Sequence, residues 1–211
     1  MATSLNEAAP AAGPLPVERL WNLPNTITLL RTLVVPVLLF FPALAGSRVG
    51  SQLMAWLFIV GAVTDLIDGW LARRGQQVTR IGKLLDPLAD KLLVATALIV
   101  LLAADRIPHW GTPMVVVIVG RELAVTGLRG LASANGHIMA AAAAGKAKTL
   151  LQNIAIGALL FPTPTLGLPA HAIGLAFLVV ATALTLWSGY GYFASYFADE
   201  AGRQALEEKR K

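Results

Sequence analysis

The chain has 211 residues, of which 56% are apolar and only 14% charged, and its mean hydropathy is +0.66. This composition lies outside the range of soluble globular domains and favours a membrane protein. The formal net charge of +5 comes from basic residues scattered between apolar runs, which indicates membrane orientation and not nucleic-acid binding. Without cysteine, the chain has no disulfide, thiolate nucleophile or zinc–thiolate site, so any metal must bind oxygen or imidazole.

The N-terminal stretch lacks the basic segment and apolar core of a cleaved signal peptide. We expect residues 1–15 to form a disordered leader. Residues 17–23, with Arg19 and Trp21, predict a short N-terminal helix in the membrane interface.

Six apolar runs follow, each close to the roughly 20 residues that a helix needs to cross a bilayer. A spanning segment must satisfy its backbone polar groups internally, so all six are predicted to be helices. The predicted spans are 26–45, 51–71, 83–104, 113–134, 145–162 and 170–196. The predicted fold is therefore an all-α integral membrane bundle of six transmembrane helices. Residues 16–198 form its single membrane domain, and residues 199–211 form a charged cytoplasmic tail.

Basic residues gather at one end of these spans. That end carries Arg19, Arg73, Arg74, Arg80, Lys83, Arg129, Lys146, Lys148, Arg203, Lys209, Arg210 and Lys211. Only Arg48 and Arg106 clearly face the other way. The positive-inside rule then places both termini and the loop after the second span in the cytoplasm, which predicts a multi-pass protein of the cell membrane.

Four aspartates lie close to or within the second and third apolar runs, where charge is unfavourable. Insertion scales put an Asp at a span centre at roughly +2.5 to +3.5 kcal/mol, so four of them need a strong compensating partner. Asp65 and Asp68 are three residues apart on the first of these helices. Asp86 and Asp90 are four apart on the second, so each pair lies along one helix face. Facing carboxylates repel unless cations lie between them, and oxygen ligands favour Mg²⁺, Mn²⁺ or Ca²⁺.

Small residues accompany these carboxylates. Gly69, Ala72 and Gly82 lie on or beside the acidic stripes and leave space for a ligand or for the facing helix. Arg73, one residue beyond the stripe, is placed to bind phosphate oxygens. The alternative is that the aspartates form surface ion pairs with neighbouring basic residues, but such pairs need neither the small residues nor the regular spacing.

The pattern D-x2-D-G-x2-A-R-x8-G-x3-D-x3-D, from Asp65 to Asp90, resembles the signature of the CDP-alcohol phosphotransferase family at all eight fixed positions. The resemblance implies a cytoplasm-facing cavity in which Asp65, Asp68, Asp86 and Asp90 hold two divalent cations, most simply Mg²⁺ with Mn²⁺ as the alternative, against the pyrophosphate of a CDP-lipid. It also implies that Asp90 is the general base for the acceptor hydroxyl. The implied CDP-lipid site is lined by Gly69, Ala72, Arg73 and Gly82. The family tends to form homodimers.

The second half of the chain must determine the acceptor alcohol. Arg121 and Arg129 lie on one helix face, with Glu122 beside Arg121 as a possible orienting partner. Lys146 and Lys148 open the fifth span, but they are two residues apart and point in different directions, so the spacing leaves open which one reaches the ligand.

The strings GRELAVTGLRGLA, AAGKAKTLLQN and NLPNTITLLR resemble the bacterial phosphatidylglycerophosphate synthase branch of the family. This resemblance implies that the substrates are CDP-diacylglycerol and glycerol 3-phosphate, and that Arg121, Arg129, Lys146 and Lys148 bind the acceptor phosphate. It also places Asn25, Thr28 and Arg31 in the cavity wall near the nucleotide. A helix start with an interfacial arginine explains the last three residues equally well.

Three alternatives remain at this stage. A cardiolipin synthase of the same family takes phosphatidylglycerol, and a phosphatidylinositol-phosphate synthase takes an acceptor that also carries a phosphate. From a different class, a magnesium transporter or a lipid-binding module would also explain an acidic membrane cavity. Transport predicts cation flux without release of CMP.

Overall fold

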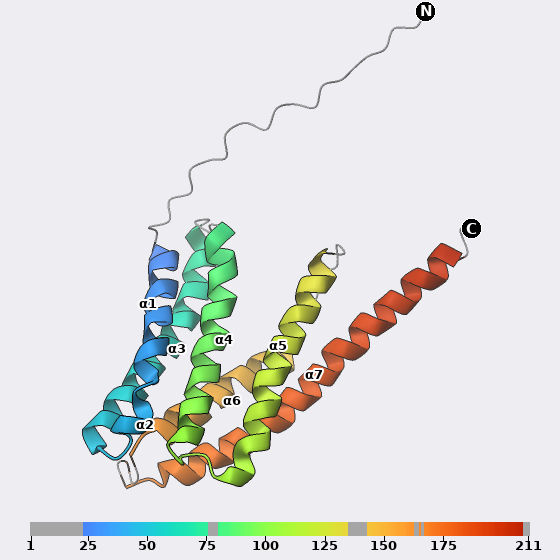
Figure 1. Cartoon of the computed structure of the whole chain (residues 1–211). Helices are drawn as coiled ribbons and strands as arrows, with labels where there is room; N and C mark the ends of the chain where they lie inside the picture. Colours follow the sequence, from blue (N-terminus) through green and yellow to red (C-terminus); the bar gives the residue numbers. More distant parts are fainter. Residues whose placement is uncertain (1–22, 76–79, 135–142, 163–164, 166, 209–211) are drawn as a thin grey trace, which may run out of the picture.

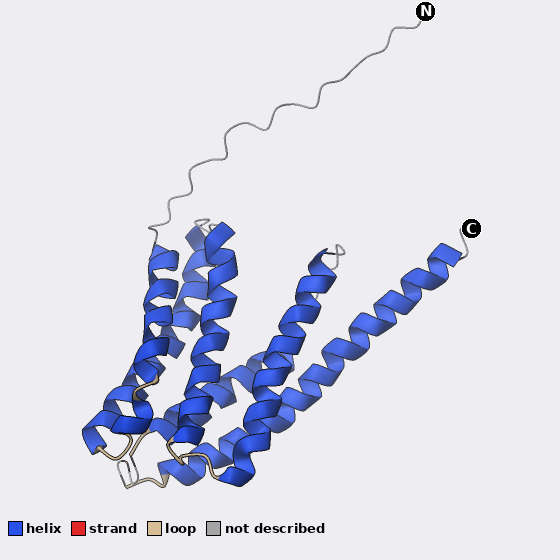
Figure 2. Cartoon of the chain, in the orientation of Figure 1, coloured by secondary structure: helices blue, strands red, loops and turns tan. Residues whose placement is uncertain are grey.

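Each long apolar run of the sequence is helical in the computed structural model, the first as two helices and the others as one each (Figures 1 and 2). The structure describes residues 23–75, 80–134, 143–162, 165 and 167–208, without the side chains of 23–25, 27, 65–75, 80–87, 143–144 and 203–208. Over these residues the α-helices are α1 (Leu23–Leu38), α2 (Phe41–Leu44), α3 (Arg48–Gly75), α4 (Arg80–Ala103), α5 (Thr112–Ala134), α6 (Ala143–Leu160) and α7 (Ala170–Glu208). A 3-10 turn, η1 (His109–Gly111), precedes α5.

The first predicted span is divided into two helices, which corrects the expectation of one helix over residues 26–45. α1 ends at Leu38, and the short α2 begins at Phe41, with Pro42 in its first turn. In a continuous helix the amide of residue 42 would donate to the carbonyl of Leu38, but proline has no amide hydrogen and its ring clashes with that carbonyl. The chain therefore turns at residues 39–40 and restarts with proline at a position where no donor is needed.

The last helix is longer than its apolar run. α7 continues beyond the predicted span, through Glu208, so most of the predicted 199–211 tail extends this helix. The predicted interfacial helix over 17–23 and the leader fall almost entirely outside the described residues. The described chain begins with α1 and ends with α7 at the same end of the bundle (Figure 1).

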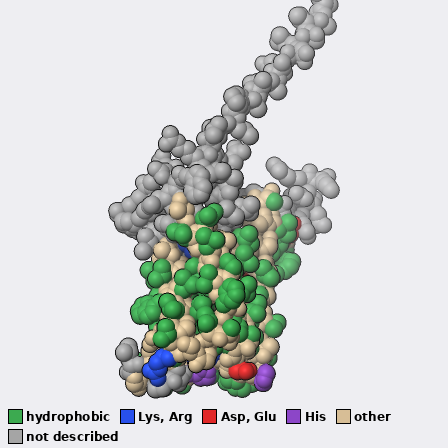
Figure 3. All heavy atoms as spheres, turned by 60° about the vertical axis from the view of Figure 1, so that its left-hand side comes forward, with side chains coloured by type: hydrophobic (Ala, Val, Ile, Leu, Met, Phe, Trp, Pro, Cys, Tyr) green, Lys and Arg blue, Asp and Glu red, His purple; other side chains and the backbone are tan. Residues whose placement is uncertain are grey.

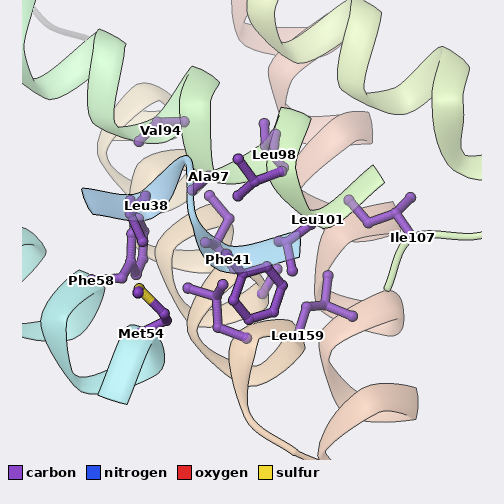
Figure 4. Close-up of a cluster of buried hydrophobic side chains, with 14 of the residues drawn as sticks. Leu38, Phe41, Met54, Phe58, Val94, Ala97, Leu98, Leu101, Ile107 and Leu159 are labelled. Carbon is purple, nitrogen blue, oxygen red and sulfur yellow. The ribbon is translucent and has the colours of Figure 1, made fainter. Parts of the chain in front are cut away.

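The apolar core lies in the half of the bundle that is distant from the aspartate-bearing turns. Phe41 of α2 is fully buried and is surrounded by side chains from α1, α3, α4 and α6, among them Leu38, Phe58 and Leu159 (Figure 4). Because this cluster contains residues from all seven described α-helices, it joins them into one packed unit. This packed cluster supports the helices that carry the polar half of the molecule.

Arg106 holds the loops together at the same end of the bundle. The turn after α4 places Asp105 at a φ of 55°, a conformation that aspartate tolerates, and the Arg106 amide donates back to the Leu101 carbonyl at 2.9 Å. The guanidinium donates to the carbonyl oxygens of Phe161 at 3.2 Å and Ala45 at 2.9 Å. It also donates to the Ser51 hydroxyl at 3.1 Å. One side chain therefore links the loops after α2, α4 and α6.

The outer surface is strongly apolar. Figure 3 shows one face covered by hydrophobic side chains, with charged and histidine side chains at its lower edge. Exposed residues include Leu30, Leu53 and Trp187, which are 57%, 64% and 73% exposed. Soluble monomers rarely expose a continuous apolar area of this kind. Among the described residues, one stretch, 170–202, has the length and hydropathy of a complete membrane span, and 28–38 and 48–64 are shorter apolar helices.

Candidate functional site

The polar site lies in the other half of the bundle, where α4, α5, α6 and α7 each contribute a side chain. Its centre is Glu122 of α5, whose side chain is 17% exposed. Lys148 of α6 donates to Glu122 Oε1, and Arg121 Nη1 donates to the same oxygen at 3.0 Å. Lys91 of α4 forms an ion pair with Glu122 Oε2, at 3.5 Å. One carboxylate therefore joins cations from three helices.

Lys148 is the most enclosed of these cations, with 1% of the residue exposed. A lysine ammonium without a partner is very unfavourable in such a place, so the Glu122 carboxylate is what permits it there. Lys146, two residues earlier, is exposed. This agrees with the helical spacing, because side chains two residues apart point in different directions. The structure thus brings Lys148, and not Lys146, together with Arg121.

α7 fixes the orientation of Arg121. Arg121 Nη2 donates to the Ser188 hydroxyl at 2.9 Å, and the guanidinium carbon lies 5.5 Å from the centre of the Tyr192 ring, within the range of a cation–π contact. Gly189 allows this approach, because a Cβ at that position would lie 3.1 Å from Arg121 Cγ. The fourth predicted acceptor residue, Arg129, lies two turns further along α5 and is exposed.

α1 supplies two buried polar residues. Thr28 is 4% exposed and Arg31 is 1% exposed, on a helix that packs against α3 and α4. An interfacial arginine would extend its guanidinium into the headgroup region, so enclosure of Arg31 does not match that interpretation. The role of Thr28 and Arg31 in the wall of a nucleotide cavity stays a prediction. The side chain of Asn25 is outside the described set.

The aspartates lie on α3 and α4, which pack together and are separated by four residues of chain. α3 is helical through Asp65 and Asp68, and α4 is helical through Asp86 and Asp90, so the three- and four-residue spacings do place each pair along one helix face. Asp90 is partly buried and directly precedes Lys91. The side chains of the other three aspartates, and of Gly69, Ala72, Arg73 and Gly82, lie outside the described residues.

The donor set suits a divalent metal. Four carboxylates on adjoining helix ends supply hard oxygen ligands of the kind that Mg²⁺ and Mn²⁺ prefer. Among the side chains that the structure describes there is no group of three potential ligands, and three of the four aspartates are not part of that set. The residues therefore fit a metal site by their chemistry and helical register.

Comparison with known proteins identifies this architecture. A family model described as CDP-alcohol phosphatidyltransferase matches residues 21–187. The chain belongs to the CDP-alcohol phosphatidyltransferase family. The matched region contains every aspartate of the signature and all cations of the Glu122 cluster.

Several members of this family are similar to the chain over most of both lengths. A protein of Bacillus subtilis (strain 168) named CDP-diacylglycerol–glycerol-3-phosphate 3-phosphatidyltransferase is 42% identical over 186 residues, which is 83% of this chain and 95% of that protein. A probable phosphatidylglycerophosphate synthase of Mycobacterium tuberculosis is 39% identical, over 87% of this chain and 86% of that protein. A phosphatidyltransferase of Shigella flexneri with the same name as the Bacillus protein is 37% identical, over 85% and 97%.

Sequence reasoning missed three members of the cluster: Lys91, Ser188 and Tyr192. The sequence could have indicated Lys91, because it lies in an apolar helix, where a lysine charge is unfavourable just as an aspartate charge is. Tyr192 is 8% exposed and packs against Val125 and Leu128. Its contact with Arg121 depends on the packing of α7 against α5, which no local pattern encodes.

Proposed function

We propose that the protein transfers the phosphatidyl group of CDP-diacylglycerol to sn-glycerol 3-phosphate, giving phosphatidylglycerophosphate and CMP. The observation that carries this proposal is the cation cluster around Glu122, whose member Lys91 directly follows Asp90 on α4. A small acceptor with a phosphate needs such cations near the reacting centre. The names of relatives that are 37% to 42% identical describe or imply the same acceptor.

We further propose that the long helices cross the cell membrane six times, as one domain over residues 16–198, with both termini and the aspartates on the cytoplasmic side. The exposed apolar side chains support this placement, because water would disfavour them. The charged residues of α4 and α5 face one another near Glu122, as the interior of a membrane bundle requires. A homodimer, expected from the family resemblance, remains a prediction that cross-linking in membranes can test.

In the proposed site, Asp65, Asp68, Asp86 and Asp90 hold two divalent cations, with Mg²⁺ as the expected metal. When bound, such ions neutralise the pyrophosphate and stabilise the departing CMP. Asp90 accepts the proton of the attacking hydroxyl. Arg73 binds phosphate oxygens of the CDP-lipid, whose site is completed by Gly69, Ala72 and Gly82 and by Asn25, Thr28 and Arg31 from α1.

The proposed acceptor site favours transfer to an alcohol that carries a phosphate. Arg121 and Lys148 bind the phosphate of glycerol 3-phosphate, which directs its free terminal hydroxyl toward Asp90. Holding two reactants in a fixed geometry removes much of the entropic barrier to their reaction. Ser188 and Tyr192 act through Arg121 by limiting the directions that its guanidinium can take.

The test is to incubate the purified full-length protein with CDP-diacylglycerol, Mg²⁺ and one alcohol at a time, and to measure CMP. We expect release with glycerol 3-phosphate, and none with any alcohol after Asp86→Asn. CMP release with phosphatidylglycerol or inositol phosphate alone would overturn the acceptor assignment and leave the family intact. Cation flux into vesicles without CMP release would overturn the enzymatic proposal.

A further inference from the structure

Lys91 is the member of the Glu122 cluster that comes from the same helix as the catalytic aspartate. Its ammonium lies 3.5 Å from Glu122 Oε2, and its side chain is 23% exposed, against 2% for that of Lys148. Lys91 therefore reaches the cluster from its open side, whereas Lys148 is enclosed within it. An open cation next to a shared carboxylate is accessible to a ligand.

The charges of the cluster do not balance. Lys91, Arg121 and Lys148 bring three positive charges to the single carboxylate of Glu122, so these four described side chains by themselves carry two positive charges in excess. Both carboxylate oxygens are already engaged, since Oε1 accepts from two cations and Oε2 is paired with the third. Excess charge in a low-dielectric interior is unfavourable until an anion arrives. A phosphate monoester, which carries close to two negative charges at neutral pH, matches this excess.

The position of Lys91 next to Asp90 also fits the shape of the acceptor. Consecutive residues of a helix differ by about 1.5 Å in height and by roughly 100° in direction. Two groups presented by Asp90 and Lys91 therefore lie at the same level but apart around the helix. Glycerol 3-phosphate likewise presents two groups apart from each other, because three carbons stand between its phosphate and its terminal hydroxyl.

We propose that Lys91 is a third cationic ligand of the acceptor phosphate, beside Arg121 and Lys148, and that the cluster selects dianionic phosphate monoesters. This inference rests on the proposed function, since it names the residues and the ligand charge of the same acceptor site. Inorganic phosphate, with the same charge and no hydroxyl chain, binds at the same place and competes with the acceptor.

The experiment measures binding of glycerol 3-phosphate and of inorganic phosphate to the full-length protein in detergent, by titration calorimetry. We expect Lys91→Gln to weaken both by about tenfold, which corresponds to the loss of one hydrogen bond to a charged group. Lys91→Arg keeps the charge and retains most of the affinity. Arg48→Gln, which removes an exposed cation at the other end of the bundle, is the matched control and leaves both affinities unchanged.

A second measurement needs no substitution. Saturating phosphate should protect the Lys91 amine of the unmodified protein from an acylating reagent, as determined by mass spectrometry, with Lys211 as the reference amine. Equal labelling with and without phosphate, or unchanged affinity in Lys91→Gln, would overturn the inference. Failure of the proposed function has a different signature: phosphate still binds through Lys91, but glycerol 3-phosphate releases no CMP.

Discussion

Two regions of the bundle, the loop end around Arg106 and the cluster around Glu122, each contain a partly buried arginine, and the two arginines differ in what accepts their hydrogen bonds. Arg106 donates to two backbone carbonyls and a serine hydroxyl, all of them neutral, and its own carbonyl accepts from His171 Nε2 at 2.8 Å. Burial lowers the pKa of the Arg106 guanidinium from its ordinary value. Arg121 instead shares a carboxylate with two lysines.

This difference agrees with a structural role for Arg106 and with the binding role that we propose for Arg121. Arg106 donates to the carbonyls of two loops and to a serine hydroxyl, so it has hydrogen-bond partners without any ligand. The Arg121 cluster satisfies its carboxylate but retains excess positive charge. A structural arginine should therefore affect folding when it is replaced, and a binding arginine should affect the use of one substrate.

The largest expected effect is that of Asp90→Asn. The amide cannot accept the proton of the acceptor hydroxyl, and general base catalysis contributes about 10²- to 10⁴-fold to a rate. We expect CMP release to fall by at least that factor with glycerol 3-phosphate at saturation. In Arg106→Leu, at the other end, the folded fraction of the protein should keep the kcat of the unmodified protein. A normal rate for Asp90→Asn would remove Asp90 from the mechanism.

Glu122→Gln should be the most destabilising change in the cluster. It leaves Lys148 enclosed without a counter-charge, and breaking a buried ion pair in this way costs about 3–5 kcal/mol. Lys148→Met should destabilise less, because it removes the enclosed charge itself and leaves Glu122 paired with Lys91 and Arg121. Unfolding in detergent, followed by circular dichroism, measures both. The account fails here if the methionine variant is the less stable of the two.

Arg121→Ala tests the contrast with Arg106 directly. We expect the KM for glycerol 3-phosphate to rise by roughly ten- to a hundredfold, the effect of losing a charge-assisted contact, while the KM for CDP-diacylglycerol stays the same. Arg106→Leu should leave both constants unchanged and lower the unfolding temperature. If the two variants change the same constants, the distinction between the two ends is wrong.

Gly189→Ala should have the smallest effect. The added Cβ would lie 3.1 Å from Arg121 Cγ, so the arginine must move by a few tenths of an ångström. We expect the KM for glycerol 3-phosphate to rise about two- to threefold, with little change in stability, since Arg121 is displaced but not removed. Gly191→Ala, on the same helix with open space around it, is the control that should change neither quantity.

Most of the fold follows from local patterns. The apolar runs predict the long helices within a few residues, because a helix is the structure that satisfies the backbone of an apolar segment. Pro42 could also have indicated the interruption between α1 and α2, but the run is apolar throughout and therefore reads as a single span. The length of α7 was underestimated because its polar end has helical sequence without an apolar face that must be buried.

The site was only partly predictable, for a physical reason. Spacing along one helix indicates which residues share a face, and this places Asp90 on the stripe of Asp86. It does not say which helix faces that stripe. The meeting of Lys91, Glu122 and Lys148 depends on the packing of α4, α5 and α6, so sequence reasoning included one of these residues as a ligand, treated one as an orienting partner and omitted Lys91.

The most direct test of the account is competition between inorganic phosphate and each substrate during CMP release by the full-length protein. Phosphate occupying the excess positive charge near Glu122 should raise the KM for glycerol 3-phosphate in proportion to its concentration and leave the KM for CDP-diacylglycerol unchanged. Inhibition that is competitive with CDP-diacylglycerol, or no inhibition at all, would show that this cluster does not bind the acceptor phosphate.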